Sequence, residues 1–399
     1  MGDGQDADRP ATAATGASSD GGAALDAPGE VLDLDAVRER CWAVLARVER
    51  GASRHFELDA RPVPAEAENL ARLIARDGVV MPTGWGHLHH TADPTGGALF
   101  ALHGRLGGTS AHERARCGFD LAALWATLHL DFARPSRAGL SLEEVTRLVA
   151  AGRFASDDAT PCADAEGLRR FAGTEAPSAE VGSRLTTLAS TLDAHPDFFS
   201  APGRFGGLLD RLPTGDDPAT IDARTVFAAT EPLTPALARG GVRIAGRETG
   251  DVRRLEGIAP NREHAGLVPL HAARQQLVLD LSDPLAEAGV TMVNLQALTA
   301  SATAASCDHM LTLGLVVPRH AAVGRLVHPM GSDIAVELRA LTVALVDRLA
   351  DRVRQTLDIE AGRLPAVAMM VPIAQRAAEK RDAAGGDRRP GVAFAEDVS

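Results

Sequence analysis

The stretch GSDIAVELRALTVALVDRLADRVRQTL, residues 331–357, decides the fold class. Ser332 is a typical N-cap residue, because its hydroxyl can accept a hydrogen bond from a free backbone N–H of the first helical turn. The apolar residues that follow recur every three or four positions, as on one face of an amphipathic helix: Ile334, Leu338, Leu341, Leu345 and Leu349. The spacing predicts one long helix with a buried apolar stripe.

Shorter segments also have helical periodicity. In residues 33–51, Asp35 suits an N-cap and Gly51 suits the stop. Residues 266–289 predict a helix that Pro269 opens and Pro284 breaks or kinks. We expect further helices at 65–76, 111–130, 141–152, 164–172, 178–194 and 203–211, and a final one near 364–381.

Evidence for strands is thinner and shows no regular alternation with helices, which argues against a Rossmann fold. The β-like runs are Val242–Ala245, Val290–Val293, Met310–Val317 and Val392–Phe394. We therefore predict a mainly α (α+β) fold, a helical domain with a few short strands. Residues 1–30 have almost nothing to bury and predict a disordered tail. Residues 31–399 predict a single domain, and a division into two helical lobes at 31–230 and 231–399 stays open.

Composition excludes several classes of protein. The net charge of −12 argues against nucleic-acid binding, and no apolar run is long enough to span a membrane. The N-terminus has no secretory signal, and the four scattered cysteines are typical of a reduced cytoplasmic protein. The single lysine, Lys380, is poorly placed for a Schiff base, and no P-loop is present. Nothing indicates a cofactor.

Two acids at the start of the long helix are candidates for catalysis. Asp333 and Glu337 are four residues apart and so share one helix face. A carboxylate there can act as a general base or hold a ribose hydroxyl. The structural alternative is a capping acid plus an acid paired with arginine.

Two other segments suggest ligand contacts. His271 is expected in the first turn of its helix, where a phosphate could bind; the alternative is a histidine bonded to a neighbouring loop. Trp85 and His87 could form a wall for a planar ligand, and core packing of Trp85 is the alternative. His87 has histidine neighbours at positions 89 and 90, but the spacing does not fit a helical metal site, and we predict no metal.

Several segments together resemble one family, the uracil-catabolism family of the URC pathway, long labelled a domain of unknown function. The matching stretches follow the family order over roughly residues 31 to 398: residues 36–59, the Trp85-x-His87 pair, and residues 113–122, 150–158, 196–212, 266–271, 283–290, 313–317 and 331–354. The last of these stretches is the specific one.

The resemblance implies a role in breaking uracil down through a ribosyl-urea-type intermediate, beside a cyclohydrolase-like protein and a phosphoribosyltransferase. The end of the pattern is also similar to the queuosine-salvage N-glycosylases, mainly helical proteins that hydrolyse an N-glycosidic bond. By this analogy Glu337 and Asp333 would be catalytic. His271, Arg339 and Arg184 would bind a nucleotide or ribosyl-urea-like ligand, together with Trp85 and His87.

The chain also departs from the family pattern. Thr303, Ala304 and Ala305 stand where the family has an acidic-Tyr-Arg triplet, although Asp308 could replace the lost carboxylate. Three hypotheses follow: an N-ribosyl hydrolase of pyrimidine breakdown, a non-catalytic paralogue that binds a nucleotide or a partner enzyme, and an enzyme with a new substrate. The sequence does not select the substrate or the oligomeric state.

Overall fold

The structure is a computed structural model, and it describes residues 29–81, 97–129, 140–157, 160–199, 203–213, 219–238, 240–258, 266–383 and 393–395. Residues 1–28 of the tail predicted for residues 1–30 lie outside the described residues. A short helix, α1 (Gly29–Leu32), begins the described part.

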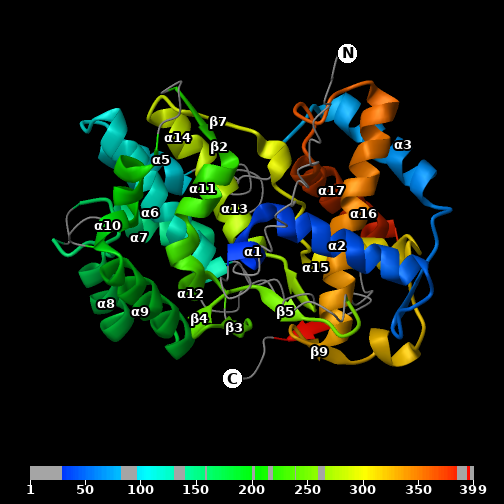
Figure 1. Cartoon of the computed structure of the whole chain (residues 1–399). Coiled ribbons are helices and arrows are strands. Elements are labelled where there is room, and N and C mark those ends of the chain that lie inside the picture. Colours follow the sequence, from blue (N-terminus) through cyan, green and yellow to red (C-terminus); the bar gives the residue numbers. More distant parts are fainter. Residues whose placement is uncertain are drawn as a thin grey trace, which may run out of the picture.

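The long helix α16 (Asp333–Leu357) confirms the prediction made from its sequence. Ser332 is its N-cap, and the Ser332 hydroxyl accepts a hydrogen bond from the backbone N–H of Ala335. Two N-terminal helices, α2 (Leu34–Glu49) and α3 (Val63–Asp77), pack against it on the right of Figure 1. Most of α16 is therefore buried, beyond the apolar stripe that the sequence predicts.

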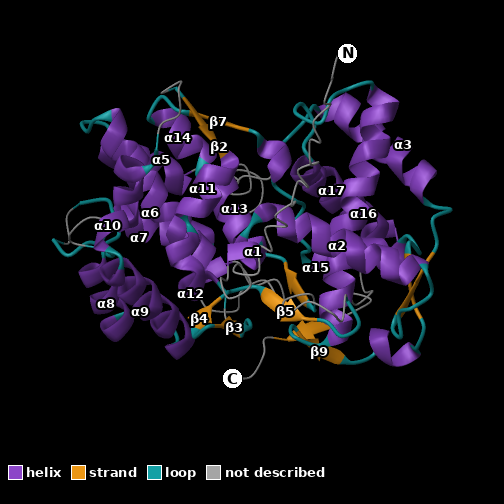
Figure 2. Ribbon diagram, in the orientation of Figure 1, coloured by secondary structure: helices purple, strands orange, loops and turns teal. Residues whose placement is uncertain are grey.

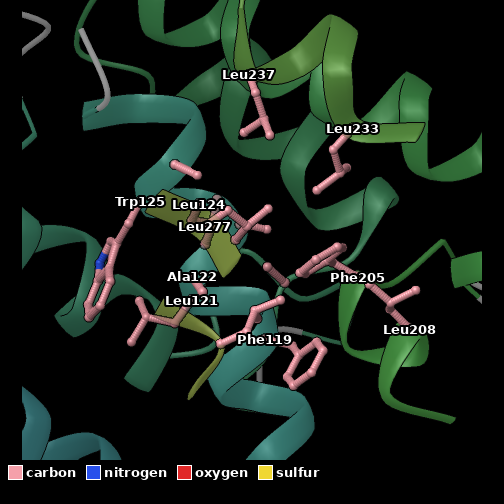
Figure 3. Packing of buried hydrophobic residues seen from close by; sticks show 14 of the residues in the cluster. Phe119, Leu121, Ala122, Leu124, Trp125, Phe205, Leu208, Leu233, Leu237 and Leu277 are labelled. Atoms are coloured by element: carbon pink, nitrogen blue, oxygen red, sulfur yellow. The ribbon is translucent and has the colours of Figure 1, made fainter. Parts of the chain in front are cut away.

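A second group of helices fills the left of Figure 1. Its central member is α6 (Ala111–His129), which packs against helices on several sides. Phe119, Leu121 and Trp125 of α6 belong to the same apolar cluster as Leu277, part of which Figure 3 shows. The helices around α6 are α5 (Gly97–Leu106), α7 (Leu142–Ala150), α8 (Ala165–Thr174), α9 (Ala179–Ala194), α10 (Pro196–Phe199), α11 (Ala223–Ala229), α12 (Thr234–Leu237), α13 (Ala272–Asp280) and α14 (Ser282–Glu287).

The buried apolar residues form two large clusters, one around α6 and one around α16. The cluster around α16 combines α2 and α3 with the C-terminal helices α15 (Ala304–Thr312) and α17 (Met370–Ala383). Segments from both ends of the sequence therefore share one core. The lobe boundaries at 230 and 231 stay a prediction.

The strands are short and pair in twos, orange in Figure 2. The antiparallel pairs are β1 (Phe56–Leu58) with β8 (Val316–Pro318), β3 (Arg243–Ile244) with β4 (Arg247–Glu248), and β5 (Val252–Arg254) with β6 (Leu267–Pro269). The parallel pairs are β2 (Thr220–Asp222) with β7 (Thr291–Val293), and β9 (Val327–Pro329) with β10 (Ala393–Ala395). The predicted mainly helical fold with a few short strands is confirmed.

Several local predictions were wrong. Pro269 ends strand β6 instead of opening a helix, and the following helix begins at Ala272. Asp33, not Asp35, caps α2. Residues 310–312 continue helix α15, so only the end of the predicted strand at 310–317 is extended. The helix predicted at 203–211 is a three-ten helix, η2 (Phe205–Arg211). The remaining three-ten segments are η3 (Glu231–Leu233), η4 (Leu295–Ala297), η5 (Ala321–Gly324) and η6 (Ala366–Met369).

Candidate functional site

A cavity of about 260 Å³ lies where the start of α16 meets the end of α2 and the loop after β5. It is lined by three cationic or titratable basic side chains, two acids and part of a loop: Arg47, Arg54, His55, Leu255, Glu256, Gly257 and Asp333. Both signs of charge face one space. Such a wall suits a small ligand that carries an anionic group and hydroxyl groups.

Asp333 is the predicted acid that faces this cavity. It is the first residue of α16, directly after the Ser332 cap, so its backbone position is fixed by the cap. The positive end of the helix dipole lies at this end of α16, where an acidic side chain is stabilising. Asp333 is therefore suited to act as a carboxylate on a bound ligand.

Glu337 lies one turn further along α16 and is buried behind the cavity wall. Its Oε2 accepts a hydrogen bond of 2.8 Å from the Ser53 hydroxyl, and its Oε1 lies 3.4 Å from Nη1 of Arg47. Burial raises the pKa of Glu337, while Ser53 and Arg47 act in the opposite direction. Glu337 does not line the cavity, but it holds Arg47, which does.

Arg47 is held on two sides. Besides Glu337, it contacts the loop at Gly257, where an added Cβ would lie 3.2 Å from Nη2 of Arg47. Gly257 has a φ of +79°, a left-handed conformation that favours glycine. The positive φ favours glycine here, and a side chain at this position would crowd the Arg47 guanidinium.

His55 and Arg54 complete the basic side of the cavity, and sequence reasoning missed both as well as Arg47. They lie in the short connection between α2 and β1. Desolvation by partial burial lowers the pKa of His55, and Arg47 adds to this effect, while Asp333 opposes it. The only signal in the sequence is a basic dipeptide in a loop, which is too common to mark a site.

Arg339 lies elsewhere. It is fully buried and binds Asp251 through two hydrogen bonds of 2.9 and 2.6 Å. Two residues along a helix turn the side chain by about 200°, so Arg339 points away from the face of Glu337. Its predicted contact with a ligand stays a prediction, but its described partners are those of a buried ion pair.

His271 caps α13 in a left-handed conformation, with a φ of 45°. Its ring is buried, and Nε2 lies 2.7 Å from the carbonyl oxygen of Val31 in α1. Burial lowers the pKa of His271 to about 4, and the neighbouring Arg274 adds to this effect. The space beside His271 measures only about 10 Å³, room for about one water molecule but not for a phosphate.

The other predicted contacts are separate from the cavity. Arg184 lies on α9 in the cluster around α6, where it pairs with Glu180 and donates to the carbonyl oxygen of Thr127. Trp85 and His87 fall outside the described residues. The structure therefore brings Asp333 and Glu337 together with Arg47, and it does not bring His271, Arg339 or Arg184 to the same cavity.

The replaced triplet has a structural role. Thr303 is the N-cap of α15, and its Oγ1 accepts a hydrogen bond from the backbone N–H of Ser306. Ala304 and Ala305 form the first turn of that helix, and none of the three lines the cavity. Within the described ranges, no three His, Cys, Asp or Glu side chains gather as they would around a metal ion.

The chain belongs to a family described as "Protein of unknown function (DUF1688)", whose model matches residues 139–378, more than half of the sequence. That range contains Glu256 and Asp333 but not Arg47, Arg54 or His55, so the cavity has walls from inside and outside it. A search of curated proteins found no match to the chain. No helix among the described residues combines the length and the apolar character needed to cross a membrane.

Proposed function

We propose that the protein hydrolyses the N-glycosidic bond of a small phosphorylated ribosyl compound, as a step in uracil breakdown. The observation that carries the proposal is that one carboxylate, Asp333, faces the same cavity as Arg47, Arg54 and His55. The reaction itself comes from the resemblance to the uracil-catabolism family. Such a step of nucleotide breakdown belongs in the cytoplasm, in keeping with four free cysteines.

The chemistry of the bond explains the residue types. Breaking a bond between C1′ and nitrogen leaves positive charge on the sugar, and a fixed carboxylate stabilises that charge. We assign this role to Asp333. Arginine forks bind phosphate oxygens well, so Arg47 and Arg54 would hold the phosphate of the ligand. Glu337 acts through Arg47 and is a positioning residue.

The size of the cavity favours a compact ligand. Ligand sites commonly enclose about 300–1,000 Å³, and this cavity of about 260 Å³ lies just below that range. A ribosyl-urea phosphate, which lacks the pyrimidine ring, is a better match than a dinucleotide.

One observation favours a second candidate, a non-catalytic paralogue that binds a nucleotide or a partner enzyme of the pathway. Thr303, Ala304 and Ala305 offer no charged or phenolic group where the family pattern has an acidic-Tyr-Arg triplet. In this case the cations around the cavity would bind a phosphorylated ligand without cleaving it.

The test is release of ribose phosphate from ribosyl-urea phosphate and from uridine monophosphate by the purified full chain. Asp333→Asn should lower kcat by about 10²-fold, because it removes the charge but keeps the shape. Asp351→Asn, at the exposed far end of the same helix, is the matched control. Binding of ribose 5-phosphate without any turnover would favour the paralogue, and absence of both would reject the cavity as the site.

A further inference from the structure

We infer that His55 is a catalytic residue of the proposed hydrolysis and takes the proton from the water molecule that attacks C1′. The inference rests on the proposed function and assigns a residue that neither the sequence pattern nor the family resemblance marks. It stands on the position of His55 in the cavity, on its anchored backbone and on the charges around its ring.

The backbone of His55 is fixed from both sides. Its N–H donates to the Ser53 hydroxyl at 3.0 Å, and its carbonyl oxygen accepts from the backbone N–H of Arg319 at 2.8 Å. The same Ser53 hydroxyl binds Glu337, so one group ties His55 to the wall that also holds Arg47. The backbone that carries the imidazole therefore has a defined position beside the cavity that Asp333 also lines.

The ring itself is available for chemistry. It lines the cavity together with Asp333, and within the described part of the chain neither ring nitrogen has a hydrogen-bond partner. His55 and Asp333 face one space without being bonded to each other. A ligand carbon and a water molecule can therefore lie between them, as a reaction that needs both groups requires.

The charges around the ring come from four directions. Asp333 approaches from α16, Arg47 from α2, Arg54 is the preceding residue, and His320 follows β8. Burial lowers the pKa of His55 from 6.5, and Arg47, His320 and Arg54 add to this effect, while Asp333 opposes it. A further acid, Glu256, lies on the cavity wall. The imidazole is therefore mainly neutral at pH 7 and can accept a proton.

The step balances as follows. A lone pair of the His55 ring takes a proton from water while the water oxygen forms a bond to C1′. The bond between C1′ and nitrogen breaks, and its electron pair goes to the leaving nitrogen. The imidazolium then gives the proton to that nitrogen, so the products are the free sugar phosphate and the amide or urea. Asp333 stabilises the charge on the sugar throughout and forms no bond.

The experiment compares the full chain with His55→Gln on ribosyl-urea phosphate between pH 5 and pH 8. The wild type should lose activity as the pH falls through the pKa of His55, because protonation removes the base. His55→Gln should lower kcat by about 10²-fold and should lose this acidic limb. Its affinity for ribose 5-phosphate should stay within about threefold, since a base contributes to the reaction and not to ground-state binding.

His320→Gln is the matched control, because it removes a neighbouring histidine that does not line the cavity and should keep the acidic limb. Turnover by His55→Gln with an unchanged pH profile would overturn this inference and leave the proposed function standing. A wild type without turnover would overturn both. If His55→Gln does not fold, the pKa of His55 is measured by NMR in the wild type, and disagreement with the kinetic limb also overturns the inference.

Discussion

Two groups of charged residues lie at the two ends of strand β5, and they differ in what satisfies their charges. Beyond its end, Glu256 faces a cavity together with Asp333 and Arg47. Just before its start, Asp251 is buried and binds Arg339 through both carboxylate oxygens. The first group leaves room for a ligand, and in the second group the opposite charges pair with each other.

The comparison shows that residue type alone does not identify a site. Asp333, Glu337 and Arg339 all lie within the first two turns of α16. Only Asp333 reaches the cavity, Glu337 supports its wall, and Arg339 is committed to Asp251. Here a side chain can bind a ligand only where a cavity lies beside it, as it does beside Asp333.

The largest expected effect comes from breaking the buried pair. Arg339→Met leaves the Asp251 carboxylate without its main partner, so it should cost about 3–5 kcal/mol in the free energy of unfolding. Arg253, at 3.6 Å from Asp251, offsets part of this loss. Urea unfolding measures the effect, and ribose 5-phosphate binding should persist wherever the variant is folded.

The double variant Asp251→Leu/Arg339→Met is the control, because it removes both charges and should recover most of the stability. An Arg339→Met protein that is as stable as the wild type but no longer binds ribose 5-phosphate would contradict the assignment of Arg339 to a purely structural pair. Arg339 would then belong to the binding site, as the sequence suggested.

An intermediate effect is expected at a third group of charged residues, in which the buried Glu66 contacts His309 and Arg376. Burial alone would raise the pKa of Glu66, but hydrogen bonds from His309 at 3.0 Å and from Arg376 at 3.3 Å lower it to about 2. A lowered carboxyl pKa stabilises the fold above the unfolded value of 4.5. This stability is lost as the pH falls from about 4.5 toward 2.

Glu66→Gln should therefore cost about 2 kcal/mol at pH 7 and should lose stability less steeply in acid than the wild type does. Thermal unfolding between pH 2 and pH 7 measures both. Glu68→Gln, an exposed acid on the same helix, is the control. Parallel pH curves for Glu66→Gln and the wild type would show that Glu66 contributes nothing to acid sensitivity.

Much of the fold was predictable because it depends on local signals. The Ser332 cap and the apolar spacing after it predicted α16, and the helix predicted at 178–194 matches α9, which Ser178 caps in the structure. Strand β6 was not predicted, because it has only three residues and its pairing with β5, across residues 255–266, leaves no mark in the local pattern. Pro269 looks like a helix start until that pairing is known.

The candidate site was predictable only in part. The spacing of Asp333 and Glu337 placed them on one face, as the structure has them. The basic wall could not be foreseen, because Arg47 and His55 lie nearly 300 residues earlier and reach α16 only through the packing of α2. The same helical geometry could have set Arg339 apart, since two residues turn a helix by about 200°.

The smallest effect tests whether the cavity depends on the start of α16. Ser332→Ala removes the N-cap bond to Ala335, and Ser178→Ala removes the equivalent bond to Val181 at α9. Each should cost about 1 kcal/mol of stability, measured by urea unfolding. Only Ser332→Ala should also weaken ribose 5-phosphate binding, because the next residue is Asp333 and a frayed first turn moves its carboxylate. Equal binding by both variants would mean that the ligand does not contact the start of this helix. The charged residues around the cavity would then differ from the buried pair in packing and not in function.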